Sequence, residues 1–281
     1  MVDCHMHMVL DGCWWKSALA RHAQSVDEAW VRRTLQTYQK AGFTYLRDGG
    51  DRWGVGKKAR ELAPEYGIVY RTPYAPLCKE GHYGSFIGTV YRNLKEYATL
   101  VRNSRDSGAD FIKIMISGLM NFDHCGVLSE DGLSRDEIQQ LIHIAHSEGM
   151  AVMAHSNGPA NTLAAAEAGV DSVEHGAYLN SETLHAMLQA GTVWVPTLST
   201  VGNLRGKGRF DDHAVCAILD IALENVATFA AMDGLLAPGT DAGAWEVPHG
   251  CNSEYNLLKA ALGENPDAIL SPGIQKIQEK F

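Results

Sequence analysis

The sequence has little of what nucleic-acid-binding, membrane-bound or secreted proteins require. It has no long basic run, and its formal net charge is −9, so neither nucleic acid nor an anionic membrane is an expected partner. No apolar stretch approaches the roughly 18–20 residues needed to cross a bilayer. The first residues also lack the basic-then-apolar pattern of a signal peptide. We therefore expect a cytoplasmic protein with no membrane partner.

Paired cysteines are also missing. The six cysteines form no CxxC motif and have no regular spacing: Cys4, Cys13, Cys78, Cys125, Cys216 and Cys251. In a chain of 281 residues this scatter indicates reduced thiols, which again favours the cytoplasm. No low-complexity segment or linker divides the chain. We expect a single domain over residues 1–281, with a catalytic core at about 3–250 and a C-terminal helical segment at 251–281.

Short apolar runs rich in β-branched residues alternate with longer segments of helical period. The expected strands are Val2–His7, Thr44–Asp48, Val69–Ala75, Phe111–Ser117, Ala151–His155, Ser172–His175, Val193–Thr197 and Leu235–Thr240. The expected helices are Val26–Lys40, Gly54–Ala63, Tyr91–Ser107, Ser134–Glu148, Pro159–Ala168, Ser181–Gln189, Asp211–Met232 and Ser253–Leu262. This alternation predicts right-handed crossovers and a parallel sheet. Eight such units fit a closed (β/α)8 TIM barrel better than an open sheet, because no glycine-rich nucleotide loop follows the first strand.

Polar residues lie where several of these strands end, which is where such barrels build their active sites. His5 and His7 are two residues apart, so both rings can share the inner face of the first strand. His155, His175 and Asp241 end the fifth, sixth and eighth strands. Four imidazoles and a carboxylate suit a divalent transition metal such as zinc. Taken singly, each histidine could be structural, and the aspartate could be a turn residue or a helix cap.

The fourth strand, FIKIMIS, carries a lysine at an inward position. Alternation directs its three isoleucines toward the helices and Lys113 toward the interior. A bare ammonium is costly there, and burial lowers the pKa of a lysine. The neutral amine can add carbon dioxide to form a carbamate, an anionic ligand whose two oxygens can bridge two metal ions. Snorkelling to the rim or pairing with an acid are the alternatives.

Together these features resemble the amidohydrolase superfamily of metal-dependent (β/α)8 hydrolases. The resemblance rests on DCHMH in the first strand, the lysine of the fourth, the histidines ending the fifth and sixth, and the aspartate ending the eighth. It covers residue 3 to about residue 250. The segments GADFIKIMISG, AHSEGMAVMAHSNG, AGVDSVEHGAYL, VPTL and GTDAG are most similar to the branch of Xaa-Pro and Xaa-Arg/Lys dipeptidases and imidazolonepropionase. The lysine favours the binuclear, dipeptidase-like type.

The resemblance implies a binuclear metal centre and no organic cofactor. Two divalent ions, zinc or else iron or manganese, would be held by six residues: His5, His7 and Asp241 for one ion, and His155 and His175 for the other, with carbamylated Lys113 and a hydroxide bridging both. Members of the branch usually also have a small β-sandwich built from segments on either side of the barrel. Because the chain starts at the first strand, we expect a barrel without this sandwich.

The resemblance also implies catalytic residues. Asp241 would accept the proton of the hydroxide and pass it to the leaving amine, as a general base and then a general acid. His175 would be a second catalytic residue, next to Asp241. The segment KEGHYG resembles a loop that puts a histidine, here His82, at the substrate, where it would help to polarise the scissile carbonyl.

Other residues near the strand ends have less specific patterns. Arg47 and Asp48 end the second strand, where we expect an interior ion pair. His249 lies in the last loop and could reach a pocket. Aromatic residues of the loops could line an apolar pocket or pack the loops together: Trp14, Trp15, Trp53, Trp245, Tyr83 and Tyr178.

The leading hypothesis is a metal-dependent hydrolase that cleaves an amide or peptide-type C–N bond in a dipeptide, an N-acyl amino acid or a cyclic amide. A deaminase or a lactonase could use the same metals, since fold and ligands do not fix the substrate. A non-catalytic barrel that binds a partner is the third hypothesis, and the intact ligand set argues against it. The expected partner is a small-molecule substrate, and assembly into a homo-oligomer stays open.

Overall fold

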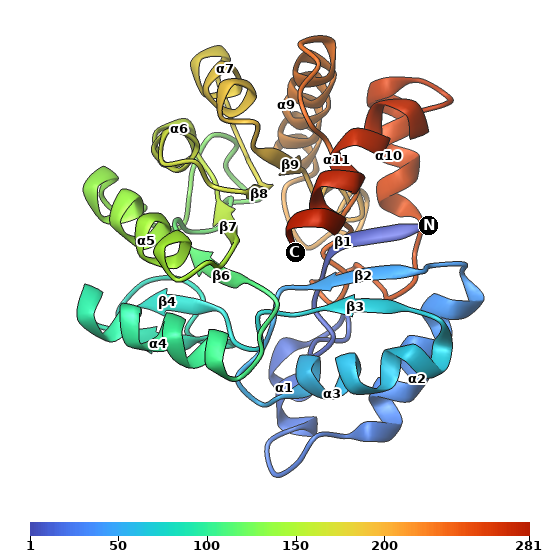
Figure 1. Ribbon diagram of the computed structural model, residues 1–281. Coiled ribbons are helices and arrows are strands. Elements are labelled where there is room, and N and C mark those ends of the chain that lie inside the picture. Colours follow the sequence, from blue (N-terminus) through green and yellow to red (C-terminus); the bar gives the residue numbers. More distant parts are fainter.

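The computed structural model describes residues 1–281 as two parallel sheets surrounded by helices. The strands are β1 (Val2–Met6), β2 (Tyr45–Asp48), β3 (Val69–Arg71), β4 (Leu77–Lys79), β5 (Thr89–Tyr91), β6 (Ile112–Met115), β7 (Val152–Ser156), β8 (Ser172–His175) and β9 (Val193–Val195). The first sheet has the order β1-β2-β3, and the second has the order β5-β4-β6-β7-β8-β9. In Figure 1 the strands lie in the middle of the molecule and the helices lie around them.

The helices between and after these strands lie around the two sheets (Figure 1). They are α1 (Trp15–Arg21), α2 (Glu28–Lys40), α3 (Val55–Leu62), α4 (Leu94–Asp106), α5 (Arg135–Ser147), α6 (Pro159–Glu167), α7 (Ser181–Ala190), α8 (Ser199–Gly202), α9 (Asp212–Ala231), α10 (Ser253–Leu262) and α11 (Asp267–Lys280). Asn93, Ser134 and Asn180 cap α4, α5 and α7, because each side chain accepts the N–H of the residue three positions later. These caps fix the residue at which each helix begins.

Residues 235–242 lie between the two sheets and hydrogen-bond to both. On one side the Trp194 N–H donates to the Leu235 carbonyl oxygen over 2.8 Å. On the other side the Cys4 N–H donates to the Pro238 carbonyl oxygen, also over 2.8 Å. The segment makes isolated parallel bridges to β1 and β9 instead of a regular ladder. Its carboxyl end therefore lies beside the carboxyl end of β1.

The expected strands other than the last are present within a few residues of their expected bounds. The expected strand Leu235–Thr240 is wrong as a regular strand, because Pro238 has no N–H to donate and a glycine follows it. Strands β4 and β5 were not expected. Tyr91, expected at the start of a helix, ends β5, and α4 begins only after its cap, Asn93.

Helix α9 contradicts the expectation that no apolar stretch is long enough to cross a bilayer. It has 20 residues and a mean hydropathy of 1.7 in its most apolar part, of which 28% is buried. By length and composition alone it could span a membrane, although core helices of other proteins pass the same test. The expectation relied on uninterrupted apolar runs, and Asp220 and Glu224 interrupt this one. Val215 and Phe229 pack in the largest core cluster of this molecule.

Strand β6 divides its side chains between the helices and the interior, as its alternation predicts. Ile112 and Ile114 pack in the core cluster that contains Leu141 of α5. Phe111, just before β6, packs instead with residues of β1, β2, β7 and β9. Lys113 shares this inner face and is 1% exposed. The sequence of β6 therefore directs a lysine into the interior at the level where the strands end.

Candidate metal centre

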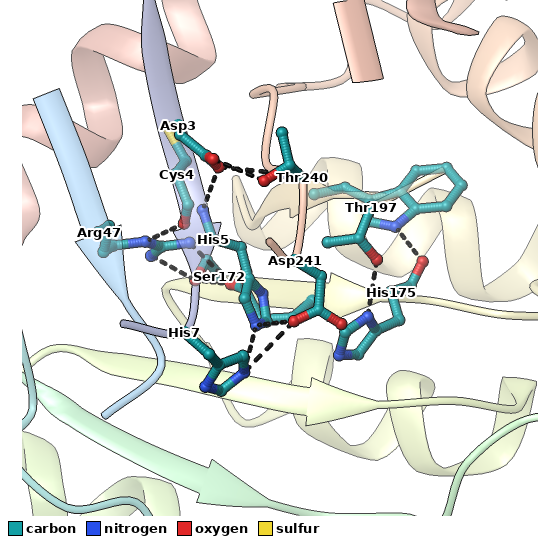
Figure 2. Close-up of polar contacts among 12 residues, drawn as sticks. Asp3, Cys4, His5, His7, Arg47, Ser172, His175, Thr197, Thr240 and Asp241 are labelled. Atoms are coloured by element: carbon teal, nitrogen blue, oxygen red, sulfur yellow. Dashed lines mark hydrogen bonds and ion pairs between the residues drawn. The ribbon is translucent and has the colours of Figure 1, made fainter. Parts of the chain in front are cut away.

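Three ligand-type atoms from the two ends of the sequence meet at the carboxyl end of β1. The Nε2 atoms of His5 and His7 are 3.4 Å apart and lie 3.5 Å and 3.3 Å from Asp241 Oδ1. Figure 2 shows the three side chains pointing toward one another. Zinc bonds of about 2.0–2.1 Å would put the corners of a tetrahedron about 3.4 Å apart, since its edge is about 1.6 times its centre-to-corner distance. The observed spacing therefore fits one ion held by all three atoms.

His175, at the end of β8, lies next to this trio. Ligand atoms of His5, His175 and Asp241 lie within 4.8 Å of one another. The His175 Nδ1 is 2.7 Å from Thr197 Oγ1, a contact also drawn in Figure 2. This bond leaves Nε2 of the ring for a ligand.

His155, near the end of β7, lies next to His175. The centroids of the two rings are 4.6 Å apart. Nε2 of His155 is 3.2 Å from the Gly118 carbonyl oxygen, so this ring is already bonded to the backbone on one side. All four expected imidazoles, Lys113 and Asp241 line one cavity.

Burial keeps the imidazoles in the neutral form, which is the form that binds metals. It lowers the pKa of His7 and the pKa of His155 to about 3. It holds the pKa values of His5 and His175 well below the ordinary value. The nearby Lys113 ammonium adds to this effect, because like charges oppose a second protonation.

Several buried polar atoms of the centre make no hydrogen bond within the protein. They are His7 Nδ1, Lys113 Nζ and Asp241 Oδ1. Burial raises the pKa of Asp241 to about 8 and lowers the pKa of Lys113 to about 8. Buried groups of this kind are costly unless something satisfies them. A divalent cation would satisfy Oδ1 and use the lone pairs of the neutral rings, so these residues fit a metal.

The backbone is strained where it presents two of these side chains. His175 has a φ of 69° and Asp241 a φ of 56°, in the left-handed region that few residues other than glycine adopt. Each such residue costs about 1–3 kcal/mol and persists only where its surroundings hold it. The Asp3 carboxylate holds Asp241 in place by accepting the N–H and the hydroxyl of Thr240 over 2.9 and 2.6 Å.

Sequence reasoning missed Glu174, which orients His5. Its Oε2 lies 2.7 Å from His5 Nδ1, and its Oε1 accepts from Arg47 over 2.8 Å and from the Ser172 hydroxyl over 2.6 Å. A ring that donates from Nδ1 to a carboxylate keeps Nε2 free as an acceptor. The feature of the sequence that could have indicated Glu174 is its position: an acidic residue inside a buried strand, two residues after Ser172 and so on the same face.

The expected interior ion pair is present at Arg47, but its partner is Glu174 and not Asp48. Successive strand residues point to opposite faces, so these two side chains diverge. Arg47 points inward and pairs with Glu174, and both side chains are fully buried. Asp48 accepts hydrogen bonds from the Thr72 hydroxyl and the Met8 N–H instead.

The centre opens into a cavity of about 600 Å³ lined by 28 residues, 15 of them hydrophobic. Seven aromatic side chains line it: Trp14, Trp15, Tyr83, Phe86, Phe122, Phe210 and Trp245. A cavity of this size and character is typical of sites for small organic molecules. Trp53, Tyr178 and His249, which were also considered as pocket residues, are not in its wall.

His82 does not line this cavity. Its side chain is 31% exposed, and its Nδ1 lies 3.6 Å from Glu130 Oε1. The next residue, Tyr83, lines the cavity and packs on His155 with ring centroids 4.8 Å apart. In the KEGHYG segment the tyrosine therefore faces the centre, and a catalytic role for His82 stays a prediction.

Comparison with known proteins gives the same family as these residues indicate. The family model described as "Amidohydrolase family" matches residues 1–261. Ochratoxinase of Aspergillus niger is 26% identical over 234 residues, which cover 71% of this chain and 47% of ochratoxinase. The chain thus spans about half the length of the curated relatives that it matches first.

Solved structures share the fold. A Xaa-Pro dipeptidase with bound methionine superposes with a TM-score of 0.79 at 19% identity, over 100% of this chain and 75% of the dipeptidase. The crystal structure of Aspergillus niger ochratoxinase superposes with a TM-score of 0.76 at 22% identity, over 99% of this chain and 69% of that enzyme.

Proposed function

We propose that this chain, which belongs to the amidohydrolase family, hydrolyses an amide C–N bond in a small molecule with the help of bound divalent metal. The observation that carries the proposal is the convergence of His5 Nε2, His7 Nε2 and Asp241 Oδ1 at distances of 3.3–3.5 Å. The fold shared with a Xaa-Pro dipeptidase and with ochratoxinase supports it. A dipeptide, an N-acyl amino acid or a cyclic amide is the proposed substrate class.

We also propose that the two sheets form one closed (β/α)8 barrel. Residues 235–242 supply hydrogen bonds between β9 and β1, and the Asp110 N–H, just before β6, donates to the Thr72 carbonyl oxygen just after β3. Core residues of strands in both sheets also pack in one interior cluster. In a barrel, all the proposed ligands would lie on one rim.

The proposed metal ligands divide into two groups. His5, His7 and Asp241 would hold one ion, and His155 and His175 would hold a second, with carbamylated Lys113 between them. Zinc is the proposed ion, since it is commonly bound by histidine and carboxylate. When bound, the ions would polarise the scissile carbonyl and lower the pKa of the attacking water toward neutrality.

The side chains of this chain would supply the remaining chemistry. Asp241 would take a proton from the attacking water on its second carboxylate oxygen, the one not assigned to the metal, and deliver it to the leaving nitrogen, as the C–O bond forms and the C–N bond breaks. Glu174 would keep His5 in the orientation that presents Nε2. The aromatic walls of the cavity would exclude bulk water from the reacting groups. The six free cysteines support a reducing, cytoplasmic location.

Metal analysis combined with a hydrolysis screen tests the proposal. The purified protein should contain at least about one equivalent of zinc, iron or manganese per chain. Changing His5 and His7 together to Ala should remove the metal and the activity, whereas changing the exposed His143 to Ala should remove neither. The screen should include dipeptides, N-acyl amino acids, cyclic imides, lactones and aminated heterocycles.

The outcomes separate the hypotheses. Release of an amine from an amide supports the proposal. Turnover of lactones alone, or release of ammonia from a heterocycle alone, would replace it by a lactonase or a deaminase. A metal-loaded protein that turns over none of these compounds would contradict it.

A further inference from the structure

The wall of the cavity has few charges outside the metal centre. Apart from the six proposed ligands, Asp123 and Arg209 are its only acidic or basic residues. The rest of the wall is apolar or carries uncharged polar groups. A charged group of a substrate that lies beyond the metal centre can therefore meet only these two side chains.

Asp123 is already engaged by the protein. Its Oδ1 accepts the N–H of Asp211 over 2.9 Å. The adjacent Phe122 and Phe210 rings pack with centroids 5.2 Å apart. These contacts join the loop after β6 to the loop before α9, and they anchor the segment that carries Arg209.

Arg209 has no carboxylate partner, unlike its neighbour Lys207, which lies 2.8 Å from Glu246. The Arg209 guanidinium carbon lies 4.0 Å from the ring centroid of Trp245 and 5.2 Å from that of Phe210. Stacking on an aromatic face restrains a guanidinium and leaves its N–H groups free at the edge, in the fork geometry that matches a carboxylate.

Trp245, on which Arg209 stacks, belongs to the same loop as the proposed metal ligand Asp241. Trp245 follows Asp241 by four residues, and the Ala244 N–H donates to the Asp241 carbonyl oxygen over 3.0 Å. The proposed proton carrier and the platform under Arg209 therefore belong to one short loop. A substrate held at both points would span the apolar part of the cavity.

We propose that Arg209, stacked on Trp245, is an anion-binding subsite that selects amides carrying a carboxylate and a large apolar group. As a statement about substrates, this rests on the proposed amide hydrolysis. The reaction is then addition of water across the C–N bond, which gives a carboxylate and an amine. The carboxylate that Arg209 binds is a separate group of the substrate and is unchanged by the reaction. Arg209 therefore orients the substrate and takes no part in the making or breaking of bonds.

Binding of a probe without a hydrolysable bond tests the subsite separately from catalysis. Calorimetry on the metal-loaded protein would compare 4-phenylbutyrate with the neutral 4-phenylbutanol. We expect the carboxylate to bind about fivefold more tightly, the upper range for an ion pair that stays in contact with water. Arg209→Gln should reduce this preference to less than about twofold, and Arg209→Lys should retain part of it because the charge remains. Lys207→Gln is the matched control and should leave it unchanged.

Turnover provides the second measurement. For N-benzoyl-leucine and its primary amide, release of benzoate should favour the acid in the native protein, and Arg209→Gln should remove this preference mainly through KM. Equal binding of acid and alcohol to the native protein would overturn the subsite. So would a preference that survives in Arg209→Gln, because the metal centre would then be the partner of the carboxylate. A preference that depends on Arg209 without any turnover would support the subsite and contradict the proposed function.

Discussion

Glu174 and Lys113 are both buried at the centre of the molecule, but only Glu174 forms an ion pair with a residue of opposite charge. Glu174 accepts from Arg47 and Ser172 and faces His5, so removing it from water is compensated. Lys113 Nζ has no partner at all. Burial lowers the pKa of Lys113 to about 8, so near neutral pH a larger share of this amine is in the neutral form, which is the nucleophile that carbamate formation needs.

Replacing Lys113 by Ala should therefore lower the metal content. The neutral amine would add to carbon dioxide and release one proton, and the resulting carbamate would supply two oxygen ligands that alanine lacks. We expect metal bound per chain to fall, while thermal stability of the metal-depleted protein stays the same or rises because an unpaired buried amine is gone. Elemental analysis and thermal unfolding measure the two effects. Lys79→Ala, which removes a partly exposed lysine paired with Glu137, is the control. Native metal content in Lys113→Ala would contradict the carbamate.

Glu174→Gln should weaken metal binding without removing a ligand. Outer partners of metal-bound histidines typically contribute about 10–100-fold to affinity, because they fix the ring orientation. We expect a loss in this range in competition with a chelator, together with lower stability because Arg47 loses its buried anion. Glu61→Gln, which disrupts an exposed pair with Lys58, should change neither. Metal affinity equal to that of the native protein would mean that His5 needs no carboxylate to orient it.

The proposed metal ligands could be predicted from the sequence, but the residues that hydrogen-bond to them could not. His5 and His7 follow from strand alternation, which is a local property. The contact of His5 with Glu174 joins residues 169 positions apart and depends on how the strands are placed around the interior. The KEGHYG loop has no periodicity, so no local rule decides whether His82 or Tyr83 faces the cavity.

At the level of elements, alternation and helical period predicted most strands and helices. Strands β4 and β5 were missed because three residues carry almost no periodic signal. The segment Leu235–Thr240 has the composition of a strand, and Pro238 prevents the ladder that would make it one.

A close contact between α11 and residue 236 gives a prediction about these elements. A Cβ added at Gly273 would lie 2.1 Å from the Leu236 carbonyl oxygen. In an open helix, Gly→Ala gains up to about 1 kcal/mol of stability. Here α11 or the segment beside β1 must move, at a cost of about 1–3 kcal/mol, so we expect net destabilisation. Urea unfolding measures it, with the exposed Ser271→Ala in the same helix as the control. A stabilised Gly273→Ala would show that α11 can move freely.

For the whole molecule, buried carboxyl groups with raised pKa values lower the stability as pH rises, whereas buried histidines with lowered pKa values raise it up to about pH 6.5. Burial raises the pKa of Glu254 from 4.5 to about 8, although the N–H and hydroxyl of Ser199 both donate to its Oε2. Between pH 4.5 and about 8 the folded protein keeps a proton that the unfolded chain has lost. The contribution of Glu254 to the free energy of unfolding therefore decreases with pH, by at most about 1.4 kcal/mol per pH unit. Burial of Asp48, which raises its pKa to about 7, acts in the same direction.

Glu254→Gln should reduce this pH dependence, because the amide stays neutral throughout. Relative to the native protein, the variant should gain stability steadily from pH 5 to pH 8, as measured by urea unfolding of the metal-depleted protein. Glu264→Gln, at an exposed position, should follow the native curve. Parallel curves for Glu254→Gln and the native protein would mean that Glu254 is ionised in the folded state at neutral pH.

The hydrogen bonds between Asp3 and Thr240 join residues 237 positions apart and set the order in which the molecule can assemble. During synthesis, the first strands and the middle strands can form their pairs as soon as they leave the ribosome, since domains form from the amino terminus onward. Asp241 cannot join His5 and His7 until the chain has been made as far as residue 241. Metal capture by these three residues is thus coupled to the joining of residues 235–242 to β1, and before that step a nascent chain offers only His5 and His7 of the three.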